Sequence, residues 1–588
     1  MEERKKHFLK TDLFALAAFV LFAALLIRSL PYWVAGADEP FFYALANRFA
    51  TGDRMLVDDW DLTQLSSVFL ILPIRLYRQF TGGTDGLILF MRRLFVGTDL
   101  LMYWVVYFTF RKKMKAVGVA AATLFCADIL VPAMSYFNLC VFFLTGAAVL
   151  TLPGSRRPSS ARLISGGLLF ACAVLCEPML CAVYFFFSLL VSIRTVGLKR
   201  GKDRFSRFSF IVNGRSWLFL TVGVAAAAAA FFIYLQLTSG LADVFRRLPE
   251  LFSSEEFKTT WYGSAGTPRK VRSTIHTFSP VGLGGLLLLL PASLIAKKRR
   301  CGRKTALLLF LLALLGLTVC YGVNASHLFD LTFYPYAFSL PVFLFGAVCC
   351  ILCEKKDDRM LALFAATAVC SLAVDYMSIV RIGFAGRLAY FPALFFCARL
   401  LTQLRRPDAQ SGIAPRKKLR PVLLAAPAAA AAVLFICLHL AFLYSVPFGE
   451  RPEMRDVARG PLQGLRYETT QTDRIEATMD DLDRIGTGGG SFYCAGQLSW
   501  AYLYLDRPAG IGSVYFYDAD STGRAVRYWS LAPERRPEYI YIPRQDDKET
   551  VAAQDLHQRL VFLGTVFDHR TIDGNAGYLL KVDGWKLL

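Results

Sequence analysis

The chain has 588 residues, 55% of them hydrophobic, and a mean hydropathy of +0.43. Together with repeated apolar runs of about 20 residues, this composition excludes an ordinary soluble protein and predicts a polytopic α-helical membrane protein. The net charge of +21 would suggest nucleic acid as the partner of a soluble protein. Most basic residues here lie in short loops between apolar runs, so membrane topology explains them and no nucleic-acid partner is expected.

The first predicted span covers about 12–34 and is apolar apart from Arg28. It follows a basic N-terminal segment, which places the N-terminus in the cytoplasm. The acidic pair Asp38-Glu39 then lies just beyond the outer end of this span. Carboxylates at a membrane surface are costly unless they have a function or a partner, so this pair is the first candidate site.

Residues 35–86 are predicted to form a long first external loop with two amphipathic helices. Apolar residues recur at helical spacing in Pro40–Ala50 and again in Leu62–Phe80. The second segment is interpreted as an interfacial helix rather than a span. A span there would move the basic stretch 111–115 to the outer face, against the positive-inside rule.

The remaining apolar runs predict about 13 spans in a membrane domain over 1–446. Each basic loop then falls on the cytoplasmic side, and the tail, 447–588, lies outside. After the first span the predicted segments are about 87–110, 116–133, 137–153, 161–176, 178–194, 216–238, 278–296, 304–323, 331–353, 358–377, 385–403 and 421–446.

The tail changes character, because its apolar runs shorten to strand length and alternate with polar, helix-like stretches. This pattern predicts a small α/β extracytoplasmic domain. Strands are expected near 491–495, 512–517, 539–542, 561–566 and 578–582, and helices near 471–484 and 522–530. Its many Tyr and Trp residues could stack on sugar rings or form its core.

Several acids have both a functional and a structural interpretation. Asp38-Glu39 could act in catalysis or cap the helix that begins at Pro40. Asp58 and Asp59 could hold a metal or lie in a solvated turn. Asp128 lies inside an apolar run, where it could be functional or simply pair with an arginine.

These features together resemble the GT-C class of membrane glycosyltransferases, which includes protein O-mannosyltransferases and the lipid A aminoarabinose transferase. The resemblance rests on Gly36-Ala37-Asp38-Glu39-Pro40 after the first span, the two interfacial helices, Arg92-Arg93-Leu94 and the overall topology. The stretch Leu62–Ser67 lacks the Pro-Pro dipeptide of those two enzyme types, which leaves the donor sugar and the acceptor open.

The resemblance implies transfer of a sugar from a polyprenyl phosphate to a glycan, lipid or protein acceptor at the outer face of the membrane. The lack of obvious external glycosylation sites beyond Asn324-Ala325-Ser326 favours a bacterial plasma membrane. Asp38 would be the general base, with Glu39 as supporting acid or alternative base. Mg²⁺ or Mn²⁺ could be held by Asp38 with Asp58, Asp59 or Asp128, and no nucleotide cofactor is expected. Arginines would stabilise the departing phosphate, and the candidates are Arg75, Arg92, Arg93, Arg381 and Arg387.

Two other functions are weighed against an enzyme. A transporter or flippase of lipid-linked glycans would be expected to show internal repeats and broken helices, and neither is evident in the sequence. A non-catalytic membrane scaffold would use the tail to bind a protein. Loss of transfer on changing Asp38 separates the enzyme from both alternatives.

Overall fold

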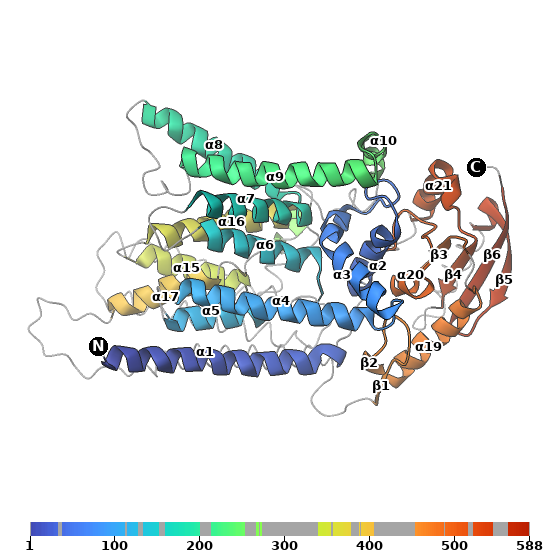
Figure 1. The fold of residues 1–588 in the computed structure, drawn as a ribbon, viewed down its shortest axis with the longest axis horizontal. Helices are drawn as coiled ribbons and strands as arrows, with labels where there is room; N and C mark the ends of the chain where they lie inside the picture. Colours follow the sequence, from blue (N-terminus) through green and yellow to red (C-terminus); the bar gives the residue numbers. More distant parts are fainter. Residues whose placement is uncertain are drawn as a thin grey trace, which may run out of the picture.

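The structure, a computed structural model, describes residues 2–32, 38–111, 115–127, 133–151, 159–199, 213–252, 266–269, 271–272, 339–353, 357–377, 387, 390–404, 453–486, 489–515, 521–544 and 563–586. Long helices run roughly alongside one another through most of the described chain, and a small sheet with flanking helices forms its C-terminal end (Figure 1). The mostly helical architecture agrees with the sequence prediction.

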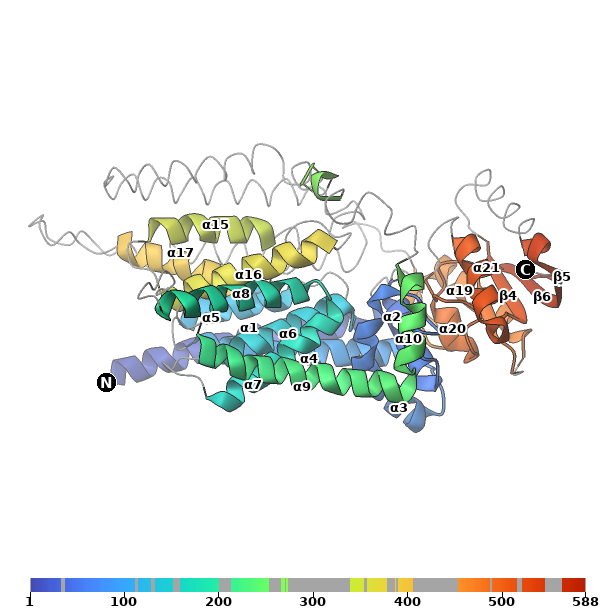
Figure 2. The same cartoon turned by 90° about the horizontal axis from the view of Figure 1, so that it is seen from above.

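The long helices follow the predicted apolar runs closely. Short polar side chains cap α7 and α9, as when Asn213 accepts a hydrogen bond from the backbone N–H of Arg215 at 3.1 Å. Seen from above, α15, α16 and α17 lie alongside the long helices of the N-terminal half (Figure 2). The bounds are α1 Glu2–Ser29, α4 Leu87–Phe110, α5 Lys115–Ala127, α6 Tyr136–Thr151, α7 Ser160–Cys176, α8 Leu180–Lys199, α9 Gly214–Thr238, α10 Leu241–Leu251, α15 Ser339–Leu352, α16 Asp358–Met377 and α17 Tyr390–Leu404.

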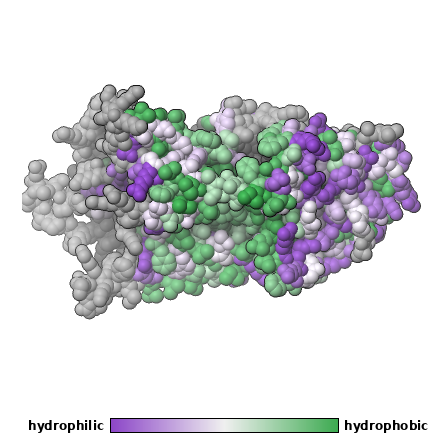
Figure 3. Space-filling view, turned by 45° about the horizontal axis from the view of Figure 1, so that its top comes forward, coloured by the Kyte–Doolittle hydropathy of each residue, from purple (hydrophilic) through white to green (hydrophobic). Residues whose placement is uncertain are grey.

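Two stretches of the described helices are long and apolar enough to cross a membrane, Ala15–Tyr32 and Gly214–Thr238. Shorter apolar stretches occur in α5, α6, α7, α8 and α17. Apolar side chains gather over the helices, and polar ones gather towards the C-terminal end (Figure 3). The count of 13 spans stays a prediction, since 278–296, 304–323 and 421–446 lie outside the described residues, as does the predicted domain boundary at 446.

Two short helices, α2 (Asp38–Thr51) and α3 (Val68–Thr81), lie between the long helices and the C-terminal part (Figure 1). A 3-10 turn, η2 (Leu62–Ser67), precedes α3 and is capped by Asp61, which accepts from the N–H of Thr63. Each helix has 14 residues and is therefore about 21 Å long, shorter than the roughly 30 Å of a bilayer core. Helices occur at both predicted positions, although α3 begins only at Val68, after the 3-10 turn. Their interfacial placement stays a prediction.

Helix α3 exposes an apolar stripe made by Leu72, Leu76 and Phe80, which recur every four residues. The side chain of Phe80 is 84% exposed. The opposite face, with Leu70 and Ile74, is buried against the rest of the protein. An apolar stripe on an otherwise docked short helix is what contact with lipid at the membrane surface requires.

The C-terminal part is built around a four-stranded mixed sheet with the order β3-β4-β6-β5. Strand β3 pairs in parallel with β4, whereas β6 is antiparallel to both β4 and β5. A separate short hairpin joins β1 to β2. The bounds are β1 Met454–Asp456, β2 Arg466–Glu468, α19 Thr469–Asp483, β3 Phe492–Cys494, α20 Trp500–Leu505, α21 Ser521–Leu531, β4 Tyr539–Pro543, β5 Phe567–Asp573 and β6 Gly577–Trp585.

The described residues of the tail form both strands and helices, and two details differ from the sequence prediction. Residues 563–566 are helical, so the strand predicted at 561–566 begins later, at Phe567. No strand forms in the described residues 512–515 of the strand predicted at 512–517. Trp500, Tyr502, Tyr528 and Trp529 are buried, so these aromatic side chains form the core and do not offer a sugar-stacking surface.

Helices α7 and α9 approach closely because glycines face the partner backbone. A Cβ atom at Gly223 would lie 1.9 Å from the carbonyl oxygen of Ile164, and one at Gly167 would lie 2.0 Å from that of Leu220. We therefore expect Gly223→Ala to lower the free energy of unfolding by about 1–3 kcal/mol through overpacking. Thermal unfolding in detergent measures this, with Gly97→Ala as control, since a Cβ at Gly97 meets nothing within 4 Å. Equal midpoints for the two variants would contradict this packing.

Candidate functional site

Asp38 is the first residue of α2 and lies where the first loop meets the C-terminal part. Its side chain is exposed, and its Oδ1 accepts a hydrogen bond of 3.0 Å from the Tyr515 hydroxyl. Surrounding protein that partly desolvates the carboxylate raises the pKa of Asp38 above its usual value, although the Tyr515 hydrogen bond lowers it in part. An accessible carboxylate with a raised pKa has the properties of a general base.

The neighbouring Glu39 has a different environment, because it is fully buried in an ion pair with Arg92. Arg92 Nε donates to Glu39 Oε1 at 2.8 Å and Nη2 donates to Oε2 at 2.7 Å. Arg92 Nη1 also donates to the Leu30 carbonyl at 2.7 Å. This bidentate pair ties α2 to α4 and to the end of the first helix. The geometry favours a structural role for both residues over base chemistry or phosphate binding.

A second buried arginine, Arg48, holds the acidic segment of the loop together. Its Nη1 donates to Asp59 Oδ2 at 2.6 Å and its Nε donates to Asp53 Oδ2 at 2.7 Å. Its Nη2 donates to the carbonyl of Asp58 at 2.8 Å. Burial raises the pKa of Asp59 to about 7, against the opposing charge of Arg48.

The C-terminal part closes over this segment with Arg535. One guanidinium nitrogen donates to Asp53 Oδ1 at 2.7 Å and the other donates to Asp58 Oδ2 at 3.0 Å. Burial would raise the pKa of Asp58, but hydrogen bonds from Arg54 and the charge of Arg535 hold it below its usual value. The acids of the first loop are thus neutralised by arginines from two distant parts of the chain.

Further contacts complete the same interface. The Tyr528 hydroxyl donates to the carbonyl of Asp58 at 3.0 Å, and Arg524 Nη2 donates to that of Trp60 at 2.7 Å. The indole of Trp60 is buried, and its backbone N–H donates to the carbonyl of Gly512 at 2.6 Å. The segment 512–515, which carries Tyr515 to Asp38, is therefore fixed by its contact with the loop.

The predicted metal ligands do not come together as a metal site in the described residues. Both carboxylates of Asp58 and Asp59 are engaged by arginine or by backbone N–H groups. Among the described residues, no group of three or more His, Cys, Asp or Glu side chains could hold a metal ion. Asp128 lies outside them. These contacts do not fit a metal site at Asp58 and Asp59.

The arginines predicted to hold the donor phosphate are dispersed. Arg75 and Arg93 are exposed, and Arg75 Nε donates to the carbonyl of Ala50 at 3.0 Å. Arg387 is buried among the long helices, with its guanidinium 5.8 Å from the ring centre of Phe125. Arg381 lies outside the described residues.

Sequence reasoning missed Arg48 and Arg535, and it named Tyr515 only among the tail aromatics that could stack on sugar rings or form the core. Arg48 interrupts the apolar stripe of its helix, a pattern that signals a buried counter-charge. Arg535 and Tyr515 lie almost 500 residues from their acidic partners, so the sequence carries no local signal for those pairings.

We expect Arg535→Gln to loosen the interface, because it removes two charged hydrogen bonds and leaves Asp53 and Asp58 partly unpaired. The expected loss of stability is about 1.5–3 kcal/mol. Hydrogen exchange of the backbone in 53–61 should speed up in this variant. Arg570→Gln is the control, because the Arg570–Asp583 pair is on the surface and its loss should change little. Unchanged exchange in 53–61 would show that Arg535 does not fix the loop.

The sequence matches no protein-family model and no curated protein. Among solved structures, the chain is similar to ArnT from Cupriavidus metallidurans bound to undecaprenyl phosphate, at 12% identity and a TM-score of 0.46, over 96% of this chain and 97% of that one. It is also similar to the Archaeoglobus fulgidus oligosaccharyltransferase tethered with an acceptor peptide, at 13% identity and a TM-score of 0.46, over 96% and 74%.

Proposed function

We propose that the chain is a glycosyltransferase that moves a sugar from a polyprenyl phosphate to an envelope acceptor at the outer membrane face. The observation that carries the proposal is the exposure of the Asp38 carboxylate together with its raised pKa. This carboxylate lies at the start of α2, where the first loop meets the C-terminal part. The apolar stripe of α3 supports placing that junction at the membrane surface.

In the proposed reaction, the Asp38 carboxylate accepts the proton of the acceptor hydroxyl or amide. The acceptor heteroatom forms a bond to the anomeric carbon as the bond from that carbon to the phosphate oxygen breaks. Polyprenyl phosphate leaves with the electron pair and its negative charge. The exposed guanidinium group of Arg93 is the candidate for stabilising that charge. Arg75 is hydrogen-bonded to the Ala50 carbonyl at the far end of α2, about 18 Å along the helix from Asp38.

Reconstituted protein tests this function directly. Proteoliposomes with the chain are supplied with a panel of radiolabelled polyprenyl-phosphate sugars and extracted envelope acceptors. We expect labelled acceptor and free polyprenyl phosphate to form in equal amounts. Movement of intact donor across the bilayer without either product would support the transporter alternative. Product formation in protein-free liposomes is the background to subtract.

The hydrogen bond from Tyr515 predicts a shift in the pH dependence of transfer. The base must be ionised, so the rate is expected to fall as the pH drops through the raised pKa of Asp38. Tyr515→Phe removes a donor that favours the ionised form, and the pKa of Asp38 should rise further. The acid limb of the rate profile should then move to higher pH, while the ring contact with Phe41 is kept. A limb at the wild-type position would contradict Asp38 as the base.

A further inference from the structure

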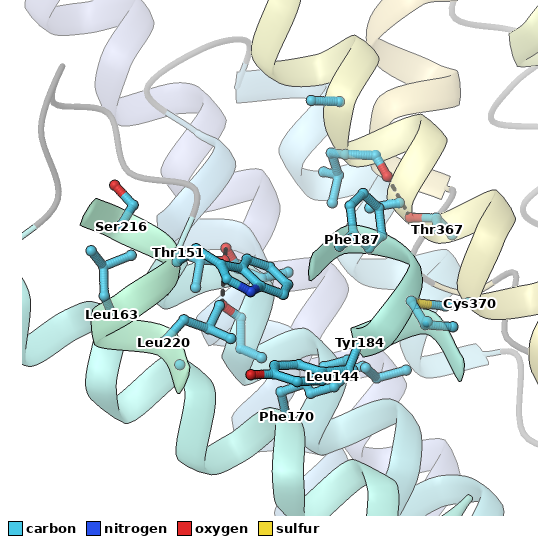
Figure 4. A pocket seen from close by; sticks show the side chains of 18 residues that line it. Leu144, Thr151, Leu163, Phe170, Tyr184, Phe187, Ser216, Leu220, Thr367 and Cys370 are labelled. Carbon is cyan, nitrogen blue, oxygen red and sulfur yellow. Dashed lines mark hydrogen bonds between the residues drawn. The ribbon is translucent and has the colours of Figure 1, made fainter. Parts of the chain in front are cut away.

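A cavity of about 170 Å³ lies between long helices (Figure 4). Helices α6, α7, α8, α9 and α16 contribute its walls, which are predominantly apolar. The lining includes Leu144, Leu163, Phe170, Phe187, Trp217 and Leu220.

Several hydroxyl groups in the lining already make hydrogen bonds within the protein, so they are poor partners for a water molecule. The Thr151 hydroxyl donates to the Ala147 carbonyl at 2.7 Å, and the Thr367 hydroxyl donates to the Leu363 carbonyl at 2.8 Å. The Tyr184 hydroxyl is 2.8 Å from that of Thr221. An apolar cavity of about 150 Å³ stays dry in other proteins and accepts small hydrocarbons. The space therefore suits a segment of hydrocarbon chain.

The position of the cavity indicates the end of the protein at which a hydrocarbon chain would enter. Thr151 ends α6, Leu163 lies in the first turn of α7, and Trp217 lies in the first turn of α9. These ends point away from the C-terminal sheet (Figure 1). The charge pattern of the sequence places them on the cytoplasmic side. Proposed sugar transfer takes place at the opposite end, so the cavity is separate from the Asp38 site.

Two exposed arginines lie next in sequence to lining residues at this end. Arg162 directly precedes the lining residue Leu163, and Arg215 directly precedes the lining residue Ser216. The indole N–H of Trp217 donates to the Ser188 hydroxyl at 3.1 Å, and its ring stacks on that of Tyr184 on α8. Basic side chains next to an apolar cavity between membrane helices complement an anionic headgroup attached to a hydrocarbon chain.

We propose that this cavity binds one acyl chain of an anionic phospholipid from the cytoplasmic leaflet, with its phosphate held by Arg162 and Arg215. The site is independent of the proposed transfer reaction and would anchor the α6–α9 end of the bundle to acidic lipid. A polyprenyl phosphate shares the same two chemical features, and the experiment separates the two lipids.

Quenching of tryptophan fluorescence by brominated acyl chains tests the proposal on the purified full-length protein in detergent. Brominated phosphatidylglycerol should quench saturably, and the quenched component should disappear in Trp217→Phe. Brominated phosphatidylcholine should bind much more weakly. The double variant Arg162→Ala/Arg215→Ala should weaken phosphatidylglycerol binding about thirty-fold. Arg246→Ala is the control, because it removes an exposed arginine at the other end, on α10.

Three results would overturn the proposal. The first is equal quenching by phosphatidylglycerol and phosphatidylcholine, and the second is unchanged affinity in the double arginine variant. The third is preferential displacement of brominated phosphatidylglycerol by polyprenyl phosphate, which would assign the cavity to the donor lipid. Ala366→Leu, which places a larger side chain in the cavity, should abolish quenching of Trp217. Thermal unfolding of this variant reports whether the protein remains folded.

Discussion

Asp38→Asn is expected to reduce sugar transfer by about 100- to 10,000-fold, the usual contribution of a positioned general base. The amide has nearly the same size and can still accept the Tyr515 hydrogen bond, but it cannot take the acceptor proton. The loss should appear in kcat with donor binding preserved, because the carboxylate acts on the reacting proton rather than on the lipid. Initial rates of labelled-acceptor formation in proteoliposomes measure this effect.

A matched control is Asp85→Asn, which removes one exposed charge from the same external loop. Its transfer rate should stay close to that of the wild type. If Asp38→Asn retained full transfer while folding normally, Asp38 would be a helix-capping residue and the base would have to be sought elsewhere. A loss of the same size in Asp85→Asn would point to a general effect of loop charge on donor capture.

The second large effect is expected from the buried Glu39–Arg92 pair. Arg92→Met leaves the Glu39 carboxylate fully buried without its bidentate partner. Breaking such a pair costs about 3–5 kcal/mol, because the remaining charge has lost its solvation and its counter-charge. We expect a clear fall in the thermal midpoint and faster proteolysis at the junction of α2 and α4.

The double variant Glu39→Leu/Arg92→Met distinguishes a structural role from a catalytic one. An apolar pair of similar volume should recover much of the lost stability, since no unpaired charge remains. Transfer activity should recover with stability if the pair only positions Asp38. Restored stability with abolished transfer would instead show that Glu39 or Arg92 takes part in the chemistry, as the sequence resemblance predicted.

Much of the helical architecture is determined locally and could be predicted from the sequence. Apolar runs with basic flanks locate the long helices, and apolar spacing locates α2 and α3 within a few residues. Alternating short apolar and polar stretches indicate the mixed α/β character of the tail. The acidic pair after the first helix also singled out Asp38, because an uncompensated carboxylate at a membrane surface is costly wherever it occurs.

The roles of the other acids were decided by tertiary structure. The adjacent residues Asp38 and Glu39 have different surroundings, because successive side chains on a helix point in different directions. One faces solvent and Tyr515, whereas the other faces Arg92 in the protein interior. Asp58 and Asp59 have the composition of metal ligands, but Arg48 and Arg535 occupy their oxygens. Which arginine pairs with which acid depends on packing between segments hundreds of residues apart. Local sequence patterns carry no information about such long-range contacts.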